Sequence, residues 1–368
     1  MTNATIVRPI EVTTLGPGYG ECTVVHIGSN QWIIVDSCID PTTNEPAALV
    51  YLRSVGVNAD DVVLIVATHW HDDHVRGLAR LMEVCGSATF CLSSVFTEKE
   101  FYRFAEIHKS KSKVDHNTSG ADEITAVLAM LSEDRQRKRK RATAERVLLN
   151  ISGQEFDHGL DVQVMSLSPS DDEHERFLLS LSKLIPDQGE TSYRAPTIHG
   201  NDTAVVLWIS VGPHCILLGA DLEETRGAWS RILDLDTRPK RHKAAIFKIP
   251  HHGSRNGHHD GVWEEMLAAN PTCLLTPYNR GHKLPLEDDV ARIVGYSANS
   301  FATKRIKLNK AKSQRSRDIQ KLIQFSGKQM ELIDQRPGRI TAQLTDPSHS
   351  GWSINLTDGA CHLNEIHL

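Results

Sequence analysis

Apolar runs that stop at groups of polar residues are the main pattern of this chain. The clearest run, Val62–Ala67, has the length of a buried strand, and residues 69–74 that follow it read His-Trp-His-Asp-Asp-His. His69 and His71 are two positions apart, so a regular helix would direct them to different faces. The pattern therefore predicts a strand followed by a sharp loop on which these side chains converge.

Two later segments repeat the arrangement. The short run Cys215–Leu218 leads to Asp221, and the run Ala244–Ile249 leads to His251 and His252. A lone aspartate after a strand is most simply a helix cap, but here it accompanies two other groups of the same kind. Three strands that end in such residues are typical of a site built along one edge of packed sheets.

The rest of the pattern predicts short strands, glycine-rich turns and several helices. Ile10–Thr14 and Cys22–Ile27 flank a turn with three glycines at 16–20, which favours an antiparallel sheet. Residues 97–107 and 121–149 have a helix-favouring composition, so we expect a helical insertion over 97–190. Further strands are predicted at 31–35, 160–167, 204–211, 273–276 and 352–356, and helices at 46–55, 75–84, 171–184, 222–233 and 262–269.

Composition and charge limit the class of protein. With 368 residues, 40% of them hydrophobic and 24% charged, the chain can bury a sizeable core, and no apolar run approaches the roughly 20 residues of a membrane span. The start of the chain lacks the pattern of a secretory signal, and the seven cysteines are scattered without a CxxC pair, which predicts reduced thiols in a cytoplasmic protein.

Two basic segments stand out against the net charge of −5, which predicts no general attraction to nucleic acid. Arg135–Arg141 has six basic residues in seven and is most simply a solvated helix face. The stretch 290–317 contains no acidic residue and eight basic ones. It is the segment of the chain that we expect to contact phosphates.

Imidazoles together with carboxylates indicate a divalent metal site. In the residues that form these groups, the sequence resembles the metallo-β-lactamase fold superfamily. His69, His71, Asp73 and His74 match its HxHxDH motif, and Asp36 matches the aspartate that ends an early strand. Gly219-Ala220-Asp221 matches the segment that carries the bridging carboxylate.

Within this superfamily, the chain is most similar to the hydrolase domain of ComEC-type DNA-uptake proteins and their soluble relatives. Residues 15–22 resemble the VGQGDA segment, and 201–207 resemble N-x-x-S-x-V-L with Ala204 in place of serine. Residues 247–254 match KVPHHGS closely. These matches span roughly residues 10–290 and leave out 97–190 and the tail.

The resemblance implies an αββα sandwich, which we expect to comprise residues 1–290. Without support from the resemblance, we expect 291–368 to be a basic segment and a C-terminal β extension packed on it. The resemblance also implies a dinuclear centre. One ion would use His69 and His71, the other Asp73, His74 and His251, with Asp221 bridging them. A histidine that many members place before the bridging aspartate is missing, and His199 or Asn201 occupies its position. Asp36 is expected to orient a ligand histidine, and His252 to support the site or act directly.

Such a centre predicts hydrolysis by a metal-bound hydroxide, because paired divalent ions lower the pKa of a shared water. Zn²⁺ and Mn²⁺ both suit ligands without thiolate. Asp73 can bind metal and orient the hydroxide. Lys248 is expected either to meet an anionic substrate or to extend its ammonium from its strand to water. His282 is a candidate for donation to the leaving group.

Three functions remain open from the sequence. The first is hydrolysis of a phosphodiester in DNA, RNA or a nucleotide, which the ComEC-type likeness and the basic stretch 290–317 favour. The second is hydrolysis of a small lactone, thioester or amide, since the same centre polarises a carbonyl. The third is a metal-stabilised binding module with a vestigial site, which the nearly intact set of ligands disfavours. No interaction with a membrane is expected.

Overall fold

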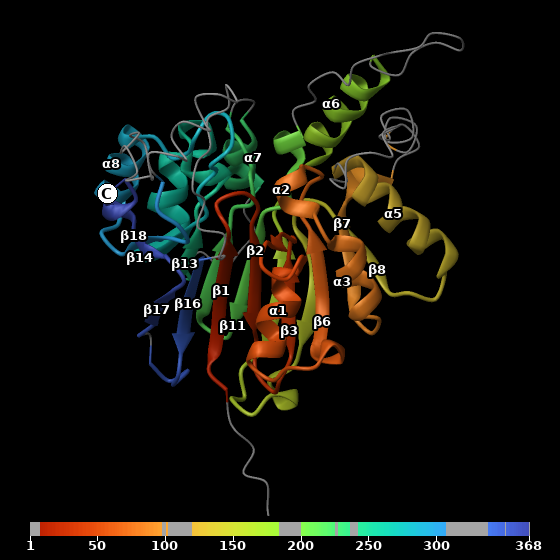
Figure 1. Cartoon of the computed structure of the whole chain (residues 1–368), viewed down its shortest axis with the longest axis horizontal. Coiled ribbons are helices and arrows are strands. Elements are labelled where there is room, and N and C mark those ends of the chain that lie inside the picture. The colour runs from red at the N-terminus through yellow and green to blue at the C-terminus, as the bar shows by residue number, and fades with distance from the viewer. Residues whose placement is uncertain are drawn as a thin grey trace, which may run out of the picture.

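Two large sheets form the centre of the molecule (Figure 1). The computed structural model describes residues 8–97, 101, 120–183, 200–224, 227–235, 242–306, 338–349 and 351–367. The first sheet consists of β1 (Ile10–Gly16), β2 (Cys22–His26), β3 (Trp32–Val35), β6 (Val62–Ala67), β7 (Thr89–Ser93), β8 (Arg139–Ala142), β16 (Gly338–Leu344) and β17 (Ser353–Thr357). Its strand order is β17-β16-β1-β2-β3-β6-β7-β8.

The second sheet also has eight strands, in the order β18-β15-β14-β13-β12-β11-β10-β9. They are β9 (Arg146–Ile151), β10 (Val162–Ser166), β11 (Leu207–Val211), β12 (His214–Leu218), β13 (Ala244–Lys248), β14 (Leu267–Leu275), β15 (Ser300–Ala302) and β18 (Cys361–His362). A small separate pair joins β4 (Ile39–Asp40) to β5 (Glu45–Pro46).

The inner faces of the two sheets share one apolar core. Ile33 and Leu64 of the first sheet belong to the same buried cluster as Ile209 and Ile246 of the second. β3 and β6 pair in parallel, as do β12, β13 and β14, and strands of this kind are covered on both faces. This double burial explains why Val62–Ala67 is a continuous apolar run rather than an alternating one.

Helices cover the outer face of each sheet. α1 (Ala47–Ser54), α3 (Leu78–Val84) and α5 (Gly120–Glu133) pack on the first sheet, and α7 (Ala228–Leu235) and α8 (Glu287–Tyr296) pack on the second. Two more helices, α2 (Asp72–Val75) and α6 (Asp171–Ser182), lie near the same end of the sheets (Figure 1). The result is the predicted αββα sandwich, which is therefore confirmed.

Shorter turns complete the described elements. The 3₁₀ turns are Ala59–Asp61, Ser94–Thr97, Gly153–Glu155, Gly200–Thr203, His251–Gly253, Arg255–Gly257 and Leu363–Glu365, and Val262–Met266 is a π turn. The helix predicted at 222–233 therefore begins later, at Ala228, and the one predicted at 262–269 is only this π turn.

The prediction of a helical insertion over 97–190 is wrong in its central part. Residues 139–142 supply β8 to the edge of the first sheet, and 146–151 supply β9 to the edge of the second. The strand predicted at 160–167 is β10, which lies beside β9. The basic run 135–141 is thus partly an edge strand, and Lys140 Nζ donates to Leu148 O at 2.6 Å. Lysine and arginine protect an exposed sheet edge from further pairing, which accounts for this composition.

The tail after residue 290 is part of both sheets rather than a layer packed outside them. β16 pairs with β1 along all seven residues of β1, and β15 and β18 extend the second sheet. In the basic stretch, residues 307–317 lie outside the described residues. Lys304 is buried and donates to Pro17 O at 3.1 Å, while Arg305 pairs with Glu365 at 2.9 Å.

Two further expectations concern the whole chain. All seven cysteines are free and buried, as expected for reduced thiols. Among the described residues, no helix has the length and apolar character needed to cross a bilayer.

Candidate metal centre

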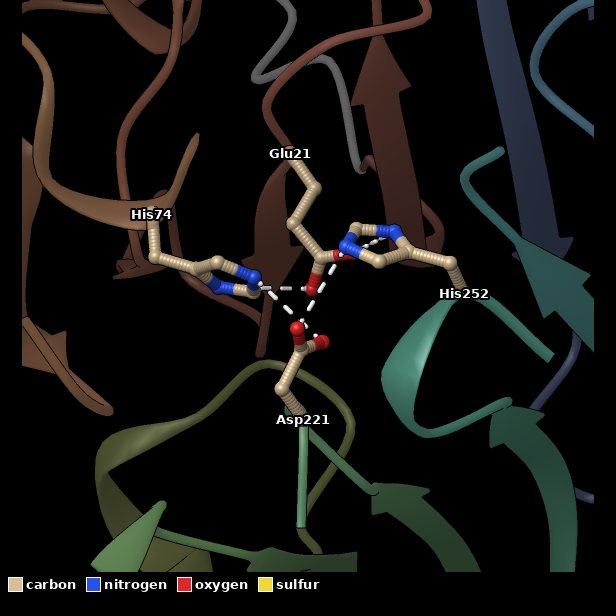
Figure 2. Close-up of side chains that lie close together, drawn as sticks. All are labelled: Glu21, His74, Asp221 and His252. Atoms are coloured by element: carbon tan, nitrogen blue, oxygen red, sulfur yellow. Dashed lines mark ion pairs between the residues drawn. The ribbon is translucent and has the colours of Figure 1, made fainter. Parts of the chain in front are cut away.

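Four side chains from distant parts of the chain meet at the end of the sheets (Figure 2). Glu21 precedes β2, His74 lies on α2, Asp221 follows β12 and His252 lies in the turn after β13. Asp221 is in the middle, with its two oxygens 3.3 Å from Nε2 of His74 and 3.3 Å from Nε2 of His252. All four side chains are buried.

Other predicted ligands lie beside this group. Asp73 Oδ2 is 3.1 Å from His252 Nε2, and His69 Nε2 is 4.0 Å from Asp221 Oδ2. The rings of His69 and His71 are 4.8 Å apart. We call the six residues His69, His71, Asp73, His74, Asp221 and His252 the histidine–carboxylate cluster. The sharp loop expected after Val62–Ala67 thus brings its side chains together.

Asp36 sets the orientation of two histidines of the cluster. It accepts a hydrogen bond from Nδ1 of His74 at 2.8 Å, and from the hydroxyl and backbone amide of Thr68, both at 2.7 Å. The same hydroxyl oxygen lies 3.0 Å from Nδ1 of His69. Because both Nδ1 atoms are engaged in this way, both Nε2 lone pairs face the centre of the site, as metal ligands require.

The two adjacent histidines after β13 point in different directions. His252 donates from Nδ1 to Thr276 O at 2.9 Å and directs Nε2 at Asp73 and Asp221. His251 instead lies between Asn201 and Asn256. The expectation that His251 is a ligand is therefore corrected. For His252, which was expected either to support the site or to act directly, the geometry favours the direct role.

The donor set fits a divalent cation. His69 Nε2, His74 Nε2 and Asp221 Oδ1 are buried and have no hydrogen-bond partner among the described residues. Two of these atoms, His74 Nε2 and Asp221 Oδ1, form an ion pair at 3.3 Å. Buried polar atoms are normally hydrogen-bonded, so three convergent atoms without a hydrogen bond indicate a missing partner. Imidazole nitrogens and carboxylate oxygens together are donors that zinc and manganese accept.

The pKa values follow from the same geometry. Burial, together with the nearby His74 and His71, lowers the pKa of His69 well below its usual value, which keeps this imidazole neutral. Burial alone would also lower the pKa of His252, but the carboxylates of Asp221 and Asp73 raise it to about 10. Burial would likewise lower the pKa of His74. The carboxylates of Asp221, Glu21 and Asp36 outweigh this effect, so the pKa of His74 is also raised.

Backbone strain is concentrated here. Asp36, Ala220, His251 and His252 have φ angles of 61°, 47°, 45° and 51°, in the left-handed region that few non-glycine residues adopt. Such conformations persist where the surrounding structure enforces them, and they gather at functional sites. At His251 and His252 they determine which of the two rings enters the cluster.

Glu21 and Lys248 form a buried ion pair behind Asp221. Lys248 is only 2% exposed, donates to Ala220 O at 3.0 Å and lies 3.9 Å from Asp221 Oδ1. The carboxylate of Glu21 also accepts a hydrogen bond from Thr276. The prediction that Lys248 meets substrate or reaches water is wrong. Glu21 was missed, although its place directly after the glycine-rich turn of the VGQGDA-like segment was a signal.

The other predicted site residues line or approach an adjacent cavity. Asn201 is buried and its Nδ2 donates to Glu223 at 2.8 Å, and it lines the cavity with His251. His282 is exposed at the cavity wall. His199 lies outside the described residues.

The cavity itself has a volume of about 750 Å³, within the usual range for small-molecule sites. Its lining includes four cluster residues (His71, Asp73, Asp221 and His252), three aromatic side chains (Tyr19, Trp70 and Tyr278) and the basic residues Arg255, His282 and Arg292. Ligand-type atoms and a substrate-sized space therefore share one location.

Comparison with known families agrees with this architecture. Residues 15–100 match the family model described as the metallo-beta-lactamase superfamily. The αββα sandwich of this chain is consistent with that match. The matched segment contains Glu21, Asp36 and the motif at 69–74, so it covers the part of the site contributed by the first sheet. No match was found among curated proteins.

Comparison with solved structures found matches of low similarity. A metallo-beta-lactamase HARLDQ motif mutant from Cronobacter sakazakii is 14% identical, with a TM-score of 0.36 over 64% of this chain and 75% of that chain. The metallo-beta-lactamase fold protein YhfI from Bacillus subtilis is 14% identical, with a TM-score of 0.39 over 80% and 95%. The metallo-beta-lactamase SMB-1 is 12% identical, with a TM-score of 0.34 over 66% and 78%.

Proposed function

We propose that this protein is a metal-dependent hydrolase with two divalent ions, zinc or manganese, in the histidine–carboxylate cluster. The observation that carries the proposal is the convergence of His69 Nε2, His74 Nε2 and Asp221 Oδ1, which are buried and have no hydrogen-bond partner among the described residues. The Nδ1 atom of His74 is already engaged by Asp36, and the Nδ1 atom of His69 by Thr68. Such preorientation is the usual arrangement around metal-binding histidines.

The cluster divides into two sets of ligands around Asp221. His69 and His71 would hold one ion, and Asp73, His74 and His252 the other, with Asp221 between them. When bound, paired divalent ions lower the pKa of water and stabilise negative charge on the attacked group. Asn201, buried on the cavity side next to Gly200, is the candidate for the position of the missing histidine. An added Cβ at Gly200 would lie 3.0 Å from His71 Nε2, so this turn abuts the first set.

The residues of the chain supply orientation and exclusion of water. Asp36 and Thr276 hold His74 and His252 in the tautomer whose Nε2 faces the centre. Asp73 orients groups on the cavity side, since it lines the cavity and contacts His252. His282, exposed at the cavity wall, is the candidate that donates a proton to the leaving group.

For the substrate we propose a phosphodiester in a nucleotide or a nucleic acid. The support is the likeness of residues 15–22, 201–207 and 247–254 to ComEC-type hydrolases, together with basic side chains at the cavity. Arg255 and His282 are exposed there, where they can meet an anionic group. In the described part of the basic stretch, Lys304 and Arg305 are engaged within the protein, whereas Arg292 lines the cavity and pairs there with Asp289 at 3.0 Å.

A substrate panel on the metal-loaded protein tests this proposal. With Zn²⁺ or Mn²⁺ added, bis(p-nitrophenyl) phosphate, short single-stranded DNA or RNA should be hydrolysed, and Asp221→Ala should abolish the activity. Hydrolysis of lactones or thioesters alone would assign the centre to carbonyl chemistry. Full metal occupancy without turnover of any ester would leave a binding module.

A further inference from the structure

The glycine-rich turn before Glu21 holds an aromatic ring at the cavity. Tyr19 lies between Gly18 and Gly20, whose φ angles are 94° and 95°. An added Cβ at Gly20 would lie 2.8 Å from Cys38 Cβ and 3.2 Å from Asp73 O, so the turn is pressed against the segment that carries Asp73. The ring of Tyr19 therefore has a fixed place beside the cluster. This placement requires positive φ angles on both sides of Tyr19, which glycine adopts readily.

A second ring comes from the loop between β14 and α8. Backbone hydrogen bonds of 2.9 Å in both directions between Tyr278 and Leu284 close this loop. Asn279 N donates to Gly18 O at 2.8 Å and ties the loop to the glycine-rich turn. The Tyr278 ring lies 5.7 Å from the ring of Tyr19 and 5.2 Å from the imidazole of His252.

These two tyrosines form an aromatic wall, by which we mean Tyr19 and Tyr278, that begins at a candidate metal ligand. Positive charge lies on the wall as well: the exposed guanidinium of Arg280 lies over the Tyr19 ring, 3.6 Å from its centre, and the guanidinium of Arg76 lies 5.5 Å from that centre. His282, on the same closed loop, lines the cavity. A planar group on this wall would thus lie close to both the candidate metal centre and positive charge.

We propose that the aromatic wall is a subsite for a nucleobase, so that the preferred substrate is a phosphodiester with a nucleoside next to the scissile bond. This inference rests on the proposed function and deepens it. Stacking on aromatic side chains is tolerant of base identity, because every base has a π face. The subsite therefore selects nucleosides over plain sugars without reading sequence.

Binding rather than turnover gives the most direct test. Affinities of the metal-loaded protein for adenosine 5′-monophosphate, ribose 5-phosphate and inorganic phosphate are measured by calorimetry. We expect the nucleotide to bind roughly tenfold or more tightly than ribose 5-phosphate, as stacking energies convert to affinity. Tyr19→Leu combined with Tyr278→Leu should reduce this preference to about onefold and leave the affinity for inorganic phosphate within about twofold.

The conservative variants separate stacking from a structural role. Tyr19→Phe and Tyr278→Phe keep the rings and should keep the preference for the nucleotide. Equal affinities for nucleotide and ribose 5-phosphate in the unaltered protein would overturn the subsite, as would a preference that survives in the double leucine variant. A preference that disappears equally in the phenylalanine variants would also overturn it, because the rings would not be the cause.

The same samples distinguish failure of the subsite from failure of the proposed function. Hydrolysis of bis(p-nitrophenyl) phosphate without any preference for nucleotide binding would refute the subsite and leave the phosphodiesterase proposal standing. A nucleotide preference that depends on the two tyrosines, without phosphodiester hydrolysis, would support the subsite and refute the assigned reaction.

Discussion

Asp36 and His74 are joined by a hydrogen bond of 2.8 Å that fixes which nitrogen of the imidazole faces the site. The carboxylate reaches His69 as well, through the hydroxyl of Thr68. One buried side chain therefore orients two candidate ligands, His69 in the loop after β6 and His74 on α2. Its own backbone is in the left-handed region, at φ 61°, directly after β3.

Replacement of Asp36 should weaken metal binding without removing a ligand. We expect Asp36→Asn to reduce metal affinity by about 10- to 100-fold, the usual cost of losing such a partner. Competition with a chromogenic chelator measures it. Asp40→Asn is the matched control, because Asp40 is a buried acid that bonds only to the turn at Thr42 and Thr43 in the described hydrogen bonds. Equal metal affinities of Asp36→Asn and Asp40→Asn would contradict a role of Asp36 in metal binding.

The pair His251 and His252 offers a direct test of the corrected ligand assignment. His252→Ala removes the ring that contacts Asp73 and Asp221, so we expect the protein to retain one metal ion instead of two after dialysis. His251→Ala should retain both ions, because that ring contacts Asn201 and Asn256. Elemental analysis gives the stoichiometry. The opposite result would restore the assignment suggested by the motif alone.

The buried pair of Glu21 and Lys248 should matter for stability more than for substrate binding. Lys248→Met leaves the Glu21 carboxylate buried without its cation, and we expect the free energy of unfolding to fall by about 3–5 kcal/mol. Adding Glu21→Gln to this variant should recover part of the loss, since the uncompensated charge is removed. Denaturant unfolding of the chelator-treated proteins measures both effects, and additive losses would contradict the pairing.

Without metal, the cluster should lose stability as the pH rises. The pKa values of His74 and His252 are raised in the folded protein, that of His252 to about 10, above the value of about 6.5 in an unfolded chain. Their contribution is therefore complete below about pH 6.5 and declines above it, by up to about 1.4 kcal/mol per pH unit for each retained proton.

Urea unfolding in the presence of a chelator at pH 6.5, 7.0 and 7.5 measures this decline below the range where ordinary cysteines ionise. Burial would raise the pKa values of Asp73 and Asp221, but the two histidines outweigh it and lower them. These carboxylates therefore stay charged over the whole pH range and do not change the dependence of stability on pH. His252→Gln should make the dependence on pH shallower. A stability that rises with pH would contradict the protonated pairs.

Much of the fold was predictable because local sequence and tertiary burial agree. Val62–Ala67 is apolar at every position because β6 is covered on both faces, and the residues after it are polar because they line the site. Residues 121–149 were predicted to be helical, but within this range 139–142 and 146–149 belong to strands. Their composition is set by an exposed sheet edge, and pairing of β8 with β7 overrides the local preference.

The site was predictable to the level of its segments and less well to the level of its side chains. Whether His251 or His252 enters the cluster depends on two left-handed backbone conformations, which no spacing rule indicates. Glu21 and Lys248 meet only because β13 and the turn before β2 lie beside each other in the folded chain. A charged residue in a strand pattern gives no sign of such a partner.

Anomalous diffraction from crystals of the protein loaded with Zn²⁺ or Mn²⁺ tests the central claim most directly. The account predicts two peaks near Asp221, one ligated by His69 and His71 and the other by Asp73, His74 and His252. Peaks away from the cluster, such as one held by Glu223 and His251, or no peak at the cluster at saturating metal, would contradict it.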